Sequence, residues 1–301
     1  MGKLILFMVT FLIAAVSFSY ADDTGSSFKV TPPPIPCIKF FPGVKQFSIT
    51  GIHYTMGELE DEAGMAGSPV AYGFDGNYAF SSKNKFLGAQ NGGIINFSYM
   101  KISMPMNLMG EEENTMRTNS YNLGFYGVID VVNGEKRDIA GEIIALKPTV
   151  ALFVGGLINY YSLNLGPLYQ MLGYTEDIKA KNLSTNYSLG IASDLPLGYF
   201  FALVPYLRYT YSLSSLQMEV PEPFNPTEFY TETYTSSYDF MDYGFDINLR
   251  PFRNAPDWII SLGMAIAQIE GFSNGNRMLT LGIKHEIGKL YSSTTIGPAL
   301  H

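Results

Sequence analysis

The stretch from Tyr199 to Leu213, YFFALVPYLRYTYSL, constrains the fold of this chain more than any other. Its side chains alternate between two faces, and a period of two is that of an extended strand. One face carries Tyr199, Phe201, Leu203, Pro205, Leu207, Tyr209, Tyr211 and Leu213. At about 3.3 Å per residue, the stretch is longer than the usual strand of a soluble sheet. Its length and the aromatic residues near both ends of the apolar face predict a strand that crosses a bilayer.

Nine further segments show the same alternation of an apolar face with a small or polar face. The clearest is Val70 to Ser81, in which Tyr72, Phe74 and Tyr78 share one face while glycine, alanine, aspartate and asparagine occupy the other. The other eight are Lys45 to Met56, Gly93 to Met104, Tyr121 to Val132, Thr149 to Leu163, Leu183 to Ala192, Tyr238 to Arg250, Trp258 to Ile269 and Met278 to Gly288. Together with the first stretch, they predict ten strands.

Three places interrupt this pattern. In the first segment the apolar parity changes after Ile49, which predicts a β-bulge at Gly51. Pro205 lacks the N–H that a ladder needs, so we expect a local kink or bulge there. The segment Arg137 to Lys147 is an eleventh strand, a helical turn, or part of an enlarged connection. Ten strands require the last of these, and twelve strands are the alternative.

The connections between the segments alternate between long and short. Residues 57–68, 105–118, 164–182 and 214–235 are long, whereas 193–198 and 251–256 are short turns. The long connections hold 13 acidic residues but only three basic ones, Arg117, Lys179 and Lys181. The opposite side carries Lys83, Lys85, Lys136, Arg137, Lys147, Arg250 and Arg253. Long loops outside the cell and short turns inside are typical of an up-and-down membrane barrel.

The composition favours a membrane barrel over a soluble sandwich. Aromatic residues make up 14% of the chain, with 21 Tyr and 21 Phe, and only 15% of residues are charged. A soluble sandwich would expose its second face, which would then be richer in Lys, Glu and Thr than these segments are. Small residues instead suit the crowded inside of a narrow barrel. Only closed ladders avoid unpaired backbone groups in hydrocarbon, so we predict an all-β, antiparallel, up-and-down transmembrane β-barrel.

The two ends of the chain lie outside the predicted barrel, which covers residues 45–291. Residues 1–21 have the pattern of an export signal, with Lys3 before an apolar run and small residues before Asp22. An uncut anchor is less favoured, because the run is shorter than the ~20 residues that a membrane helix needs. Residues 22–44 contain five prolines and predict an extended periplasmic leader or a plug in the lumen. Residues 292–301 form a C-terminal tail.

With this signal and these segments, the chain resembles the small outer-membrane β-barrel proteins of bacteria. The last segment keeps one parity up to Tyr291, close to the terminal aromatic that is usual for the class, although the tail follows. The resemblance implies a place in the bacterial outer membrane, contact with membrane lipid and lipopolysaccharide, and insertion by the barrel-assembly machinery. It implies no cofactor. The net charge of −8 and the lack of a basic run exclude a nucleic-acid partner, and the single Cys37 excludes an internal disulfide.

Polar residues on the predicted inward faces form the candidate site. If the strands around residues 214–235 pair, Arg208 and Asp242 fall nearly opposite each other, with Asp246, Asn248 and Arg250 below. Isolated charges inside a narrow barrel are costly, so we expect them to pair. Further polar residues of this interior are Asp75, Asn77, Asn96, Asn122 and Asp130. Such a network either fills the lumen or forms a charged constriction that selects small solutes.

The predicted loops carry two further candidate surfaces. Acidic side chains at Glu58, Glu60, Asp61 and Glu62 and at Glu111, Glu112 and Glu113 either bind divalent cations or are simply solvated. Aromatic side chains at Phe224, Phe229, Tyr230 and Tyr234 form a recognition surface or fold the loop over the barrel mouth.

Three functions remain open at this point. The first is a structural or surface barrel that acts through its acidic loops and has a narrow, side-chain-filled lumen. The second is a narrow channel for small solutes. The third, an outer-membrane hydrolase, needs a polar dyad near the rim. His53 is predicted to face the lumen and His285 the lipid, and neither has an evident partner, so we expect no enzyme.

Overall fold

The structure is a computed structural model. It describes residues 45–55, 69–82, 86, 89, 91–106, 114–132, 136–139, 142–145, 148–164, 179–197, 200–222, 225–252, 258–269 and 276–287. The predicted export signal, the proline-rich leader with Cys37, the acidic clusters, Phe224 and the C-terminal tail lie outside these residues and stay predictions.

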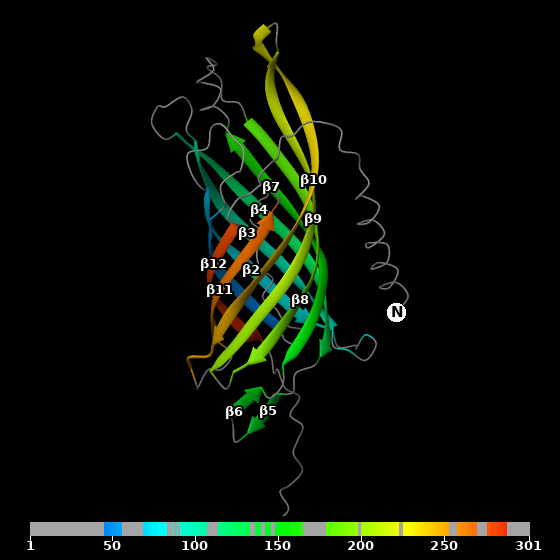
Figure 1. The fold of residues 1–301 in the computed structure, drawn as a ribbon, viewed down its shortest axis with the longest axis vertical. Helices are drawn as coiled ribbons and strands as arrows, with labels where there is room; N and C mark the ends of the chain where they lie inside the picture. The colour runs from blue at the N-terminus through cyan, green and yellow to red at the C-terminus, as the bar shows by residue number, and fades with distance from the viewer. Residues whose placement is uncertain are drawn as a thin grey trace, which may run out of the picture.

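Ten strands pair in one closed, fully antiparallel barrel (Figure 1). They are β1 (Lys45–Thr55), β2 (Val70–Ser81), β3 (Asn91–Met106), β4 (Asn114–Val132), β7 (Thr149–Asn164), β8 (Lys179–Pro196), β9 (Phe201–Glu222), β10 (Asn225–Leu249), β11 (Trp258–Ile269) and β12 (Asn276–Ile287). Each strand pairs with its neighbours in the chain, and β1 closes the wall against β12. The prediction of a ten-stranded, up-and-down, all-β barrel is confirmed.

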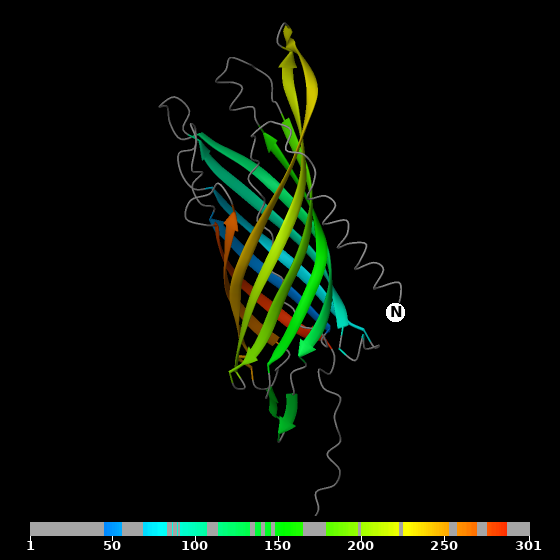
Figure 2. The same cartoon turned by 45° about the vertical axis from the view of Figure 1, so that its right-hand side comes forward.

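The connection between β4 and β7 contains a small hairpin of its own. Strands β5 (Lys136–Ile139) and β6 (Glu142–Ala145) pair only with each other and lie below the barrel wall (Figure 2). The segment Arg137 to Lys147 is therefore neither a wall strand nor a helical turn. The alternative of twelve wall strands is wrong, because this short, charged hairpin has no long apolar face to place against lipid.

The wall is much taller on one side than on the other. Strands β9 and β10 have 22 and 25 residues, whereas β1 has 11 and β11 and β12 have 12 each. Among the described residues, β10 meets β11 only from Phe240 onward, so Asn225 and residues 229–239 pair with β9 alone, and this hairpin projects beyond the wall (Figures 1 and 2). The prediction of a loop at 214–235 is wrong. Its polar sequence hid the strands, because a projecting hairpin has no need of a lipid-facing apolar side.

The other predicted long loops are also shorter than expected. Strands β3 and β4 pair out to Met106 and Asn114, and β7 and β8 pair out to Asn164 and Lys179. The added ends of β4 and β8 are mostly polar, so alternation of apolar residues did not mark them.

The two faces of the wall differ in the way a bilayer requires. Large apolar side chains point outward and are exposed, including Tyr72, Phe74, Phe97, Leu123, Leu189, Leu262 and Leu281. Inward side chains are buried and include small, polar and aromatic groups as well as aliphatic ones such as Ile94, Met100 and Leu157. A closed ladder leaves no unpaired edge, so such a wall is stable in hydrocarbon. Within the described residues, no helix has the length and apolar character needed to cross a membrane.

The first strand runs without the predicted bulge. Its pairing with β2 and β12 keeps one register from Lys45 to Thr55, through Gly51. Ile52 and Tyr54 point inward and are buried, because an apolar cluster fills the lumen near the outer end of β1. Apolar residues therefore occupy both faces there, and the change of parity in the sequence needs no bulge.

Pro205 also causes no change of register. The pairing of β9 with β10 continues through Pro205 and Phe245. On the side of β8, Ala192 pairs with Tyr206 and Leu195 pairs with Leu203, which is the same register. Val204 and Pro205, which lie between, have no partner position on β8. The prediction of a bulge is wrong: the missing N–H interrupts the pairing on one side only.

Candidate functional site

A continuous row of polar residues winds around the inside of the wall. Its members are direct partners across successive strand pairs, and we name the row the polar spiral. In order it contains Asn248, Ser261, Gly282, Thr50, Asp75, Ser98, Asn122, Asn159, Ser184, Ser214 and Ser236. All except Gly282 carry a polar side chain. The spiral lines the lumen from the lower end of β10 to its outer part.

The polar spiral also gives the stagger of the strands around the closed barrel. It starts on β10 at Asn248 and, after one turn, returns to the same strand at Ser236, which is a shift of 12 residues. At about 3.4 Å per residue, this corresponds to roughly 40 Å along the strand. Such a stagger accompanies the tilt of the strands in a closed barrel.

Asparagine and serine side chains of the spiral bond to one another from strand to strand. Asn122 Nδ2 donates to Ser98 Oγ at 2.7 Å, and Asn159 Nδ2 donates to Asn122 Oδ1 at 2.6 Å. Ser184 Oγ extends the chain to Asn159 Oδ1 at 3.5 Å. An amide both donates and accepts, so successive amides satisfy one another where water has little access. Of these residues, only Asn122 was among the predicted site residues.

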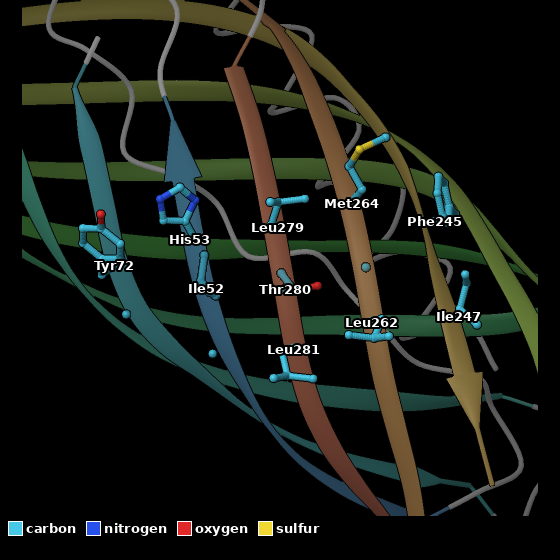
Figure 3. Close-up of a pocket in the computed structure, with 13 residues that line it drawn as sticks. Ile52, His53, Tyr72, Phe245, Ile247, Leu262, Met264, Leu279, Thr280 and Leu281 are labelled. Carbon is cyan, nitrogen blue, oxygen red and sulfur yellow. The ribbon is translucent and has the colours of Figure 1, made fainter. Parts of the chain in front are cut away.

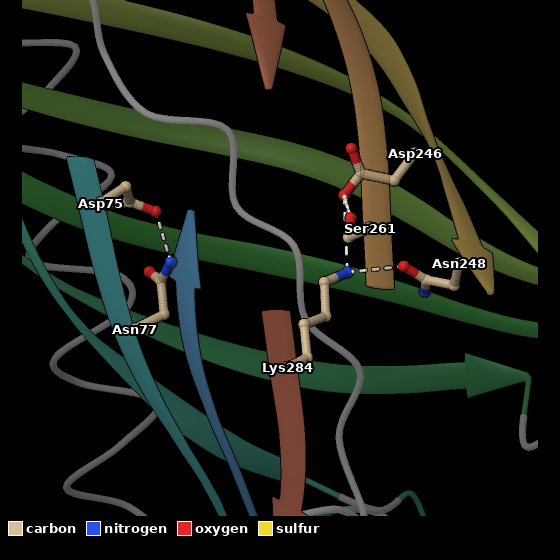
Figure 4. Close-up of polar contacts among 6 residues, drawn as sticks. All are labelled: Asp75, Asn77, Asp246, Asn248, Ser261 and Lys284. Carbon is tan, nitrogen blue, oxygen red and sulfur yellow. Dashed lines mark hydrogen bonds and ion pairs between the residues drawn. The ribbon is translucent and has the colours of Figure 1, made fainter. Parts of the chain in front are cut away.

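The predicted residues Asp75, Asn77 and Asn96 form one compact cluster on β2 and β3. The amides of Asn77 and Asn96 both donate to the Asp75 carboxylate, and Asn96 Nδ2 also donates to Asn77 Oδ1 at 2.7 Å. Figure 4 shows the contact between Asp75 and Asn77. All three side chains are buried, so the carboxylate is held by neutral donors from its own strand and the next.

Arg208 and Asp242 lie directly opposite each other on β9 and β10. Arg208 Nε is 2.8 Å from Asp242 Oδ1, and Nη2 is 3.0 Å from Oδ2, so the pair is bidentate. Arg208 is 1% exposed and Asp242 is 3% exposed. Two parallel charge-assisted bonds compensate for much of the lost hydration.

A second charged group spans three strands lower in the barrel (Figure 4). Lys284 Nζ on β12 donates to Asn248 Oδ1 at 2.8 Å and lies 3.5 Å from Asp246 Oδ2, both on β10. From β11, Ser261 Oγ donates to the same Asp246 oxygen at 3.2 Å. The structure therefore brings the predicted Asp246 and Asn248 together around a lysine that the sequence analysis missed.

The remaining predicted residues lie near the lower end of the lumen. Arg250 Nη2 contacts Glu286 Oε1 at 3.0 Å, and Glu286 was not predicted. Asp130 is buried on the inward face of β4, at the point where the pairing with β7 shifts register. Lys284 and Glu286 alternate with outward Ile283 and His285, so their parity alone was a usable signal.

Large side chains occupy the middle of the lumen. Tyr126 is 1% exposed and lies close enough to Arg208, Asp242 and Asp75 to interact electrostatically with all three. Its ring packs over Gly155 on β7, where a Cβ would collide with the Phe125 carbonyl oxygen and with Tyr126 Cδ1. Glycine at this position therefore gives an aromatic ring the room to lie across a narrow lumen.

The prediction that His53 faces the lumen is wrong. His53 points outward and its ring lies 4.9 Å from that of Tyr72. It borders a shallow groove on the outside of the wall, lined mainly by apolar side chains such as Leu279, Leu281 and Phe245 (Figure 3). The first strand keeps one parity past Gly51, and this places His53 with Phe47 and Ile49 on the lipid side.

His285 points outward as predicted, and its ring lies 4.5 Å from that of Trp258. Neither of the two described histidines thus faces the lumen. In the part of the chain that the structure describes, no three His, Cys, Asp or Glu side chains are grouped so that they could hold a metal ion.

No family model matches the sequence, and no curated protein sequence matches it. The fold is similar to that of the outer-membrane protease OmpT of Escherichia coli, with 11% identity over 83% of this chain and 99% of that one, and a TM-score of 0.45.

Two further solved structures are also similar. The transport unit of the autotransporter AIDA-I of Escherichia coli has 10% identity over 91% of this chain and 97% of that one, with a TM-score of 0.44. The attachment invasion locus protein Ail of Yersinia pestis has 10% identity over 81% and 99%, with a TM-score of 0.31. One of these three is a protease and two are not named as enzymes.

The geometry of the wall itself locates the protein. It is closed, its outward side chains are apolar and exposed, and its polar groups are gathered in the lumen. This is the arrangement of a β-barrel of the bacterial outer membrane.

Proposed function

We propose that this protein is a closed, non-conducting outer-membrane barrel that acts at the cell surface through the hairpin formed by β9 and β10. The observation that carries the proposal is the filled lumen. Arg208, Tyr126, Asn122 and Asn159 are at most 1% exposed, and three of them are bonded to residues of neighbouring strands. An open pore would leave such groups hydrated.

The projecting hairpin has the chemistry of a recognition surface. Tyr230 and Tyr234 both donate to Glu232, which ties three side chains of β10 together, and Tyr230 stays exposed. The paired strand β9 adds Glu219 and Glu222. Aromatic groups beside carboxylates suit a partner that offers both cationic and apolar groups. Divalent cations at the acidic loop clusters remain part of this proposal.

The narrow-channel alternative has one observation in its favour, because charges line the lumen of a membrane barrel. The hydrolase alternative has less support, since both described histidines face outward. Single-channel recording in planar bilayers separates the first two. We expect the purified protein to give no discrete conductance steps in a bilayer where an open porin gives them.

A variant with an opened lumen serves as the positive control for this recording. Replacing Tyr126, Arg208 and Asp242 together with Ala removes the central side chains and both members of the Arg208–Asp242 pair, and we expect steps to appear. Migration on unboiled gels checks that the variant is folded. Steps from the native protein would favour the channel and contradict a closed barrel.

Labelling of intact cells tests the surface position of the hairpin. Thr233 lies on the projecting part of β10 and is exposed, so in a Cys37→Ser background we expect Thr233→Cys to react with a membrane-impermeant maleimide. The matched control, Ala145→Cys on β6, lies at the opposite end of the barrel and should react only after cell lysis. The reverse result would mean that the hairpin points into the periplasm.

A further inference from the structure

The outward face formed by β10, β11 and β12 carries one anion and one cation. Asp239 lies on β10 and Arg277 on β12, and both side chains are exposed. Among the described outward positions of these three strands, they are the only Asp, Glu, Lys or Arg side chains. Neither makes an ion pair with another described residue, although Asp239 is hydrogen-bonded to the Tyr209 hydroxyl. Both charges are therefore accessible to a binding partner.

Asp239 and Arg277 lie at the same height on either side of β11. Arg277 is the direct partner of Ile266, which is the direct partner of Tyr243 on β10. The polar spiral shifts by 12 residues around ten strands, so a position on β12 lies about two residues higher than its row on β10. This shift brings Arg277 level with residues 239–241. Within one copy the two positions are about 17 Å apart, from four residues along the strand and two strand spacings across it, which is too far for contact.

Below these charges, the same face is hollowed. The shallow groove has a volume of about 720 Å³, and Gly51 on β1 forms part of its floor (Figure 3). A Cβ at Gly51 would meet only the Leu281 carbonyl oxygen, at 3.5 Å, so the space above it is open. By the same shift of height, Phe245 on β10 lies level with Leu281 on β12. The face thus has a hollow on its β12 side and an aromatic ring at the same height on its β10 side.

We infer that this face binds a second copy of the same protein, related by a two-fold axis that runs parallel to the barrel axis in front of β11. Such an axis sets β12 of each copy against β10 of the other, because it exchanges the two sides of the face. Arg277 of one copy then meets Asp239 of the other, twice in the dimer. Each Phe245 ring enters the groove of the other copy beside Leu281, over Gly51. The contact closes at two copies.

The arrangement of charge favours a second copy over a lipid molecule. A lipid phosphate would be attracted by Arg277 but repelled by Asp239 at the same height, and an acyl chain alone would leave both charges unpaired. Apolar contact by itself adds little in a bilayer, because lipid is as apolar as the face, so specific association needs close packing and polar pairs. The two-fold arrangement supplies both. The inference does not depend on whether the lumen conducts or on what the hairpin binds.

The test measures energy transfer between donor-labelled and acceptor-labelled copies of the full protein in lipid vesicles. The labels are attached at Thr233→Cys, which is exposed, in a Cys37→Ser background. We expect transfer that falls when unlabelled protein is added. Arg277→Asp and Asp239→Arg should each raise the dissociation constant of the dimer about 10-fold, since each replaces two exposed ion pairs by two repulsive contacts.

Mixing these two variants gives a sharper result. A mixed dimer of Arg277→Asp with Asp239→Arg has opposite charges at both contacts, so the mixture should dimerise nearly as well as the native protein. The double variant with both changes should do the same. Lys101→Asp, an exposed position on β3, has the same change of charge elsewhere on the wall and should leave the transfer unchanged.

The groove is tested without any change of charge. Gly51→Leu places a side chain over the floor, and we expect it to weaken the dimer about 10-fold. Gly127→Leu is the matched control, because it has similar room on the outward face of β4 and should associate like the native protein. Unboiled gel migration confirms that every variant is folded.

Four results would overturn the inference. The first is a native protein that is monomeric in the vesicles. The second is a mixture of the two charge variants that associates no better than each variant alone. The third is undiminished association of Gly51→Leu, and the fourth is an equal loss in either control, Lys101→Asp or Gly127→Leu.

Discussion

The lumen holds two ion pairs that are equally buried but differently built. Arg208 and Asp242 have side-chain exposures of 1% and 4%, and so do Lys284 and Asp246. The first pair joins directly opposed positions on two adjacent strands with two short bonds. The second reaches across β11, has a longer separation of 3.5 Å, and depends on polar neighbours.

The difference shows two ways in which a barrel can keep a charge in its lumen. A guanidinium and a carboxylate match in shape, so each satisfies most of the other's needs. An ammonium group is a compact donor that accepts several partners, and here Asn248 and Asp246 share it. Arg208 makes two bonds to one carboxylate, that of Asp242. The contacts of Lys284 are instead divided between Asp246 and Asn248.

The largest effect is expected when the bidentate pair is broken. Asp242→Ala removes the carboxylate that makes the bidentate contact with the buried Arg208, and we expect a loss of about 3–5 kcal/mol in the free energy of unfolding. Urea titration in micelles, followed by tyrosine and tryptophan fluorescence, measures it. The double variant Arg208→Met, Asp242→Leu should recover most of the lost stability, because neither of these two positions then carries a buried charge. A double variant as unstable as the single one would show that packing, and not charge, dominates here.

A smaller effect is expected in the shared group. Lys284→Met removes the cation, but Asp246 still accepts from Ser261, so we expect a loss of about 1–3 kcal/mol in the same titration. Adding Ser261→Ala should then increase the loss by more than Ser261→Ala costs alone. If Lys284→Met costs as much as Asp242→Ala, the number of partners does not matter and the comparison fails.

The smallest effect is expected at the lower mouth of the lumen. The Arg250 side chain is 19% exposed in its pair with Glu286, so water and salt screen the interaction. We expect Arg250→Gln to cost no more than about 1 kcal/mol, and less at high salt. A loss comparable to that of Lys284→Met would mean that exposure does not rank these pairs.

Much of the architecture could be predicted from the sequence, because a bilayer imposes a regular pattern on the strands that cross it. The alternation of apolar and small residues located all ten wall strands, and the facing positions of Arg208 and Asp242 followed from one hairpin. Outside the bilayer, strands need no apolar face, and there the alternation of residues did not predict them. The projecting part of β9 and β10 has no lipid-facing side, and its polar sequence resembled a loop.

The interior was harder to predict than the wall. Lys284 and Asp246 are separated by a whole strand, so their contact depends on the stagger of three strands and not on one turn. His53 was misplaced because the apolar cluster around Ile52 and Tyr54 gave the first strand two apolar faces. Such features depend on how side chains from distant strands fill one space, which periodicity does not encode.

The polar spiral has a consequence for how the molecule is assembled. It crosses the seam between the first and last strands at Thr50 and Gly282, where a Cβ on Gly282 would lie 2.5 Å from Thr50 Oγ1. A slip of two residues is the smallest that keeps inside and outside apart, and it would set Thr280 or Lys284 against Thr50 instead. A side chain larger than glycine would then face Thr50 across the seam, so the pair of Gly282 and Thr50 favours the observed register of the two strands that close the barrel.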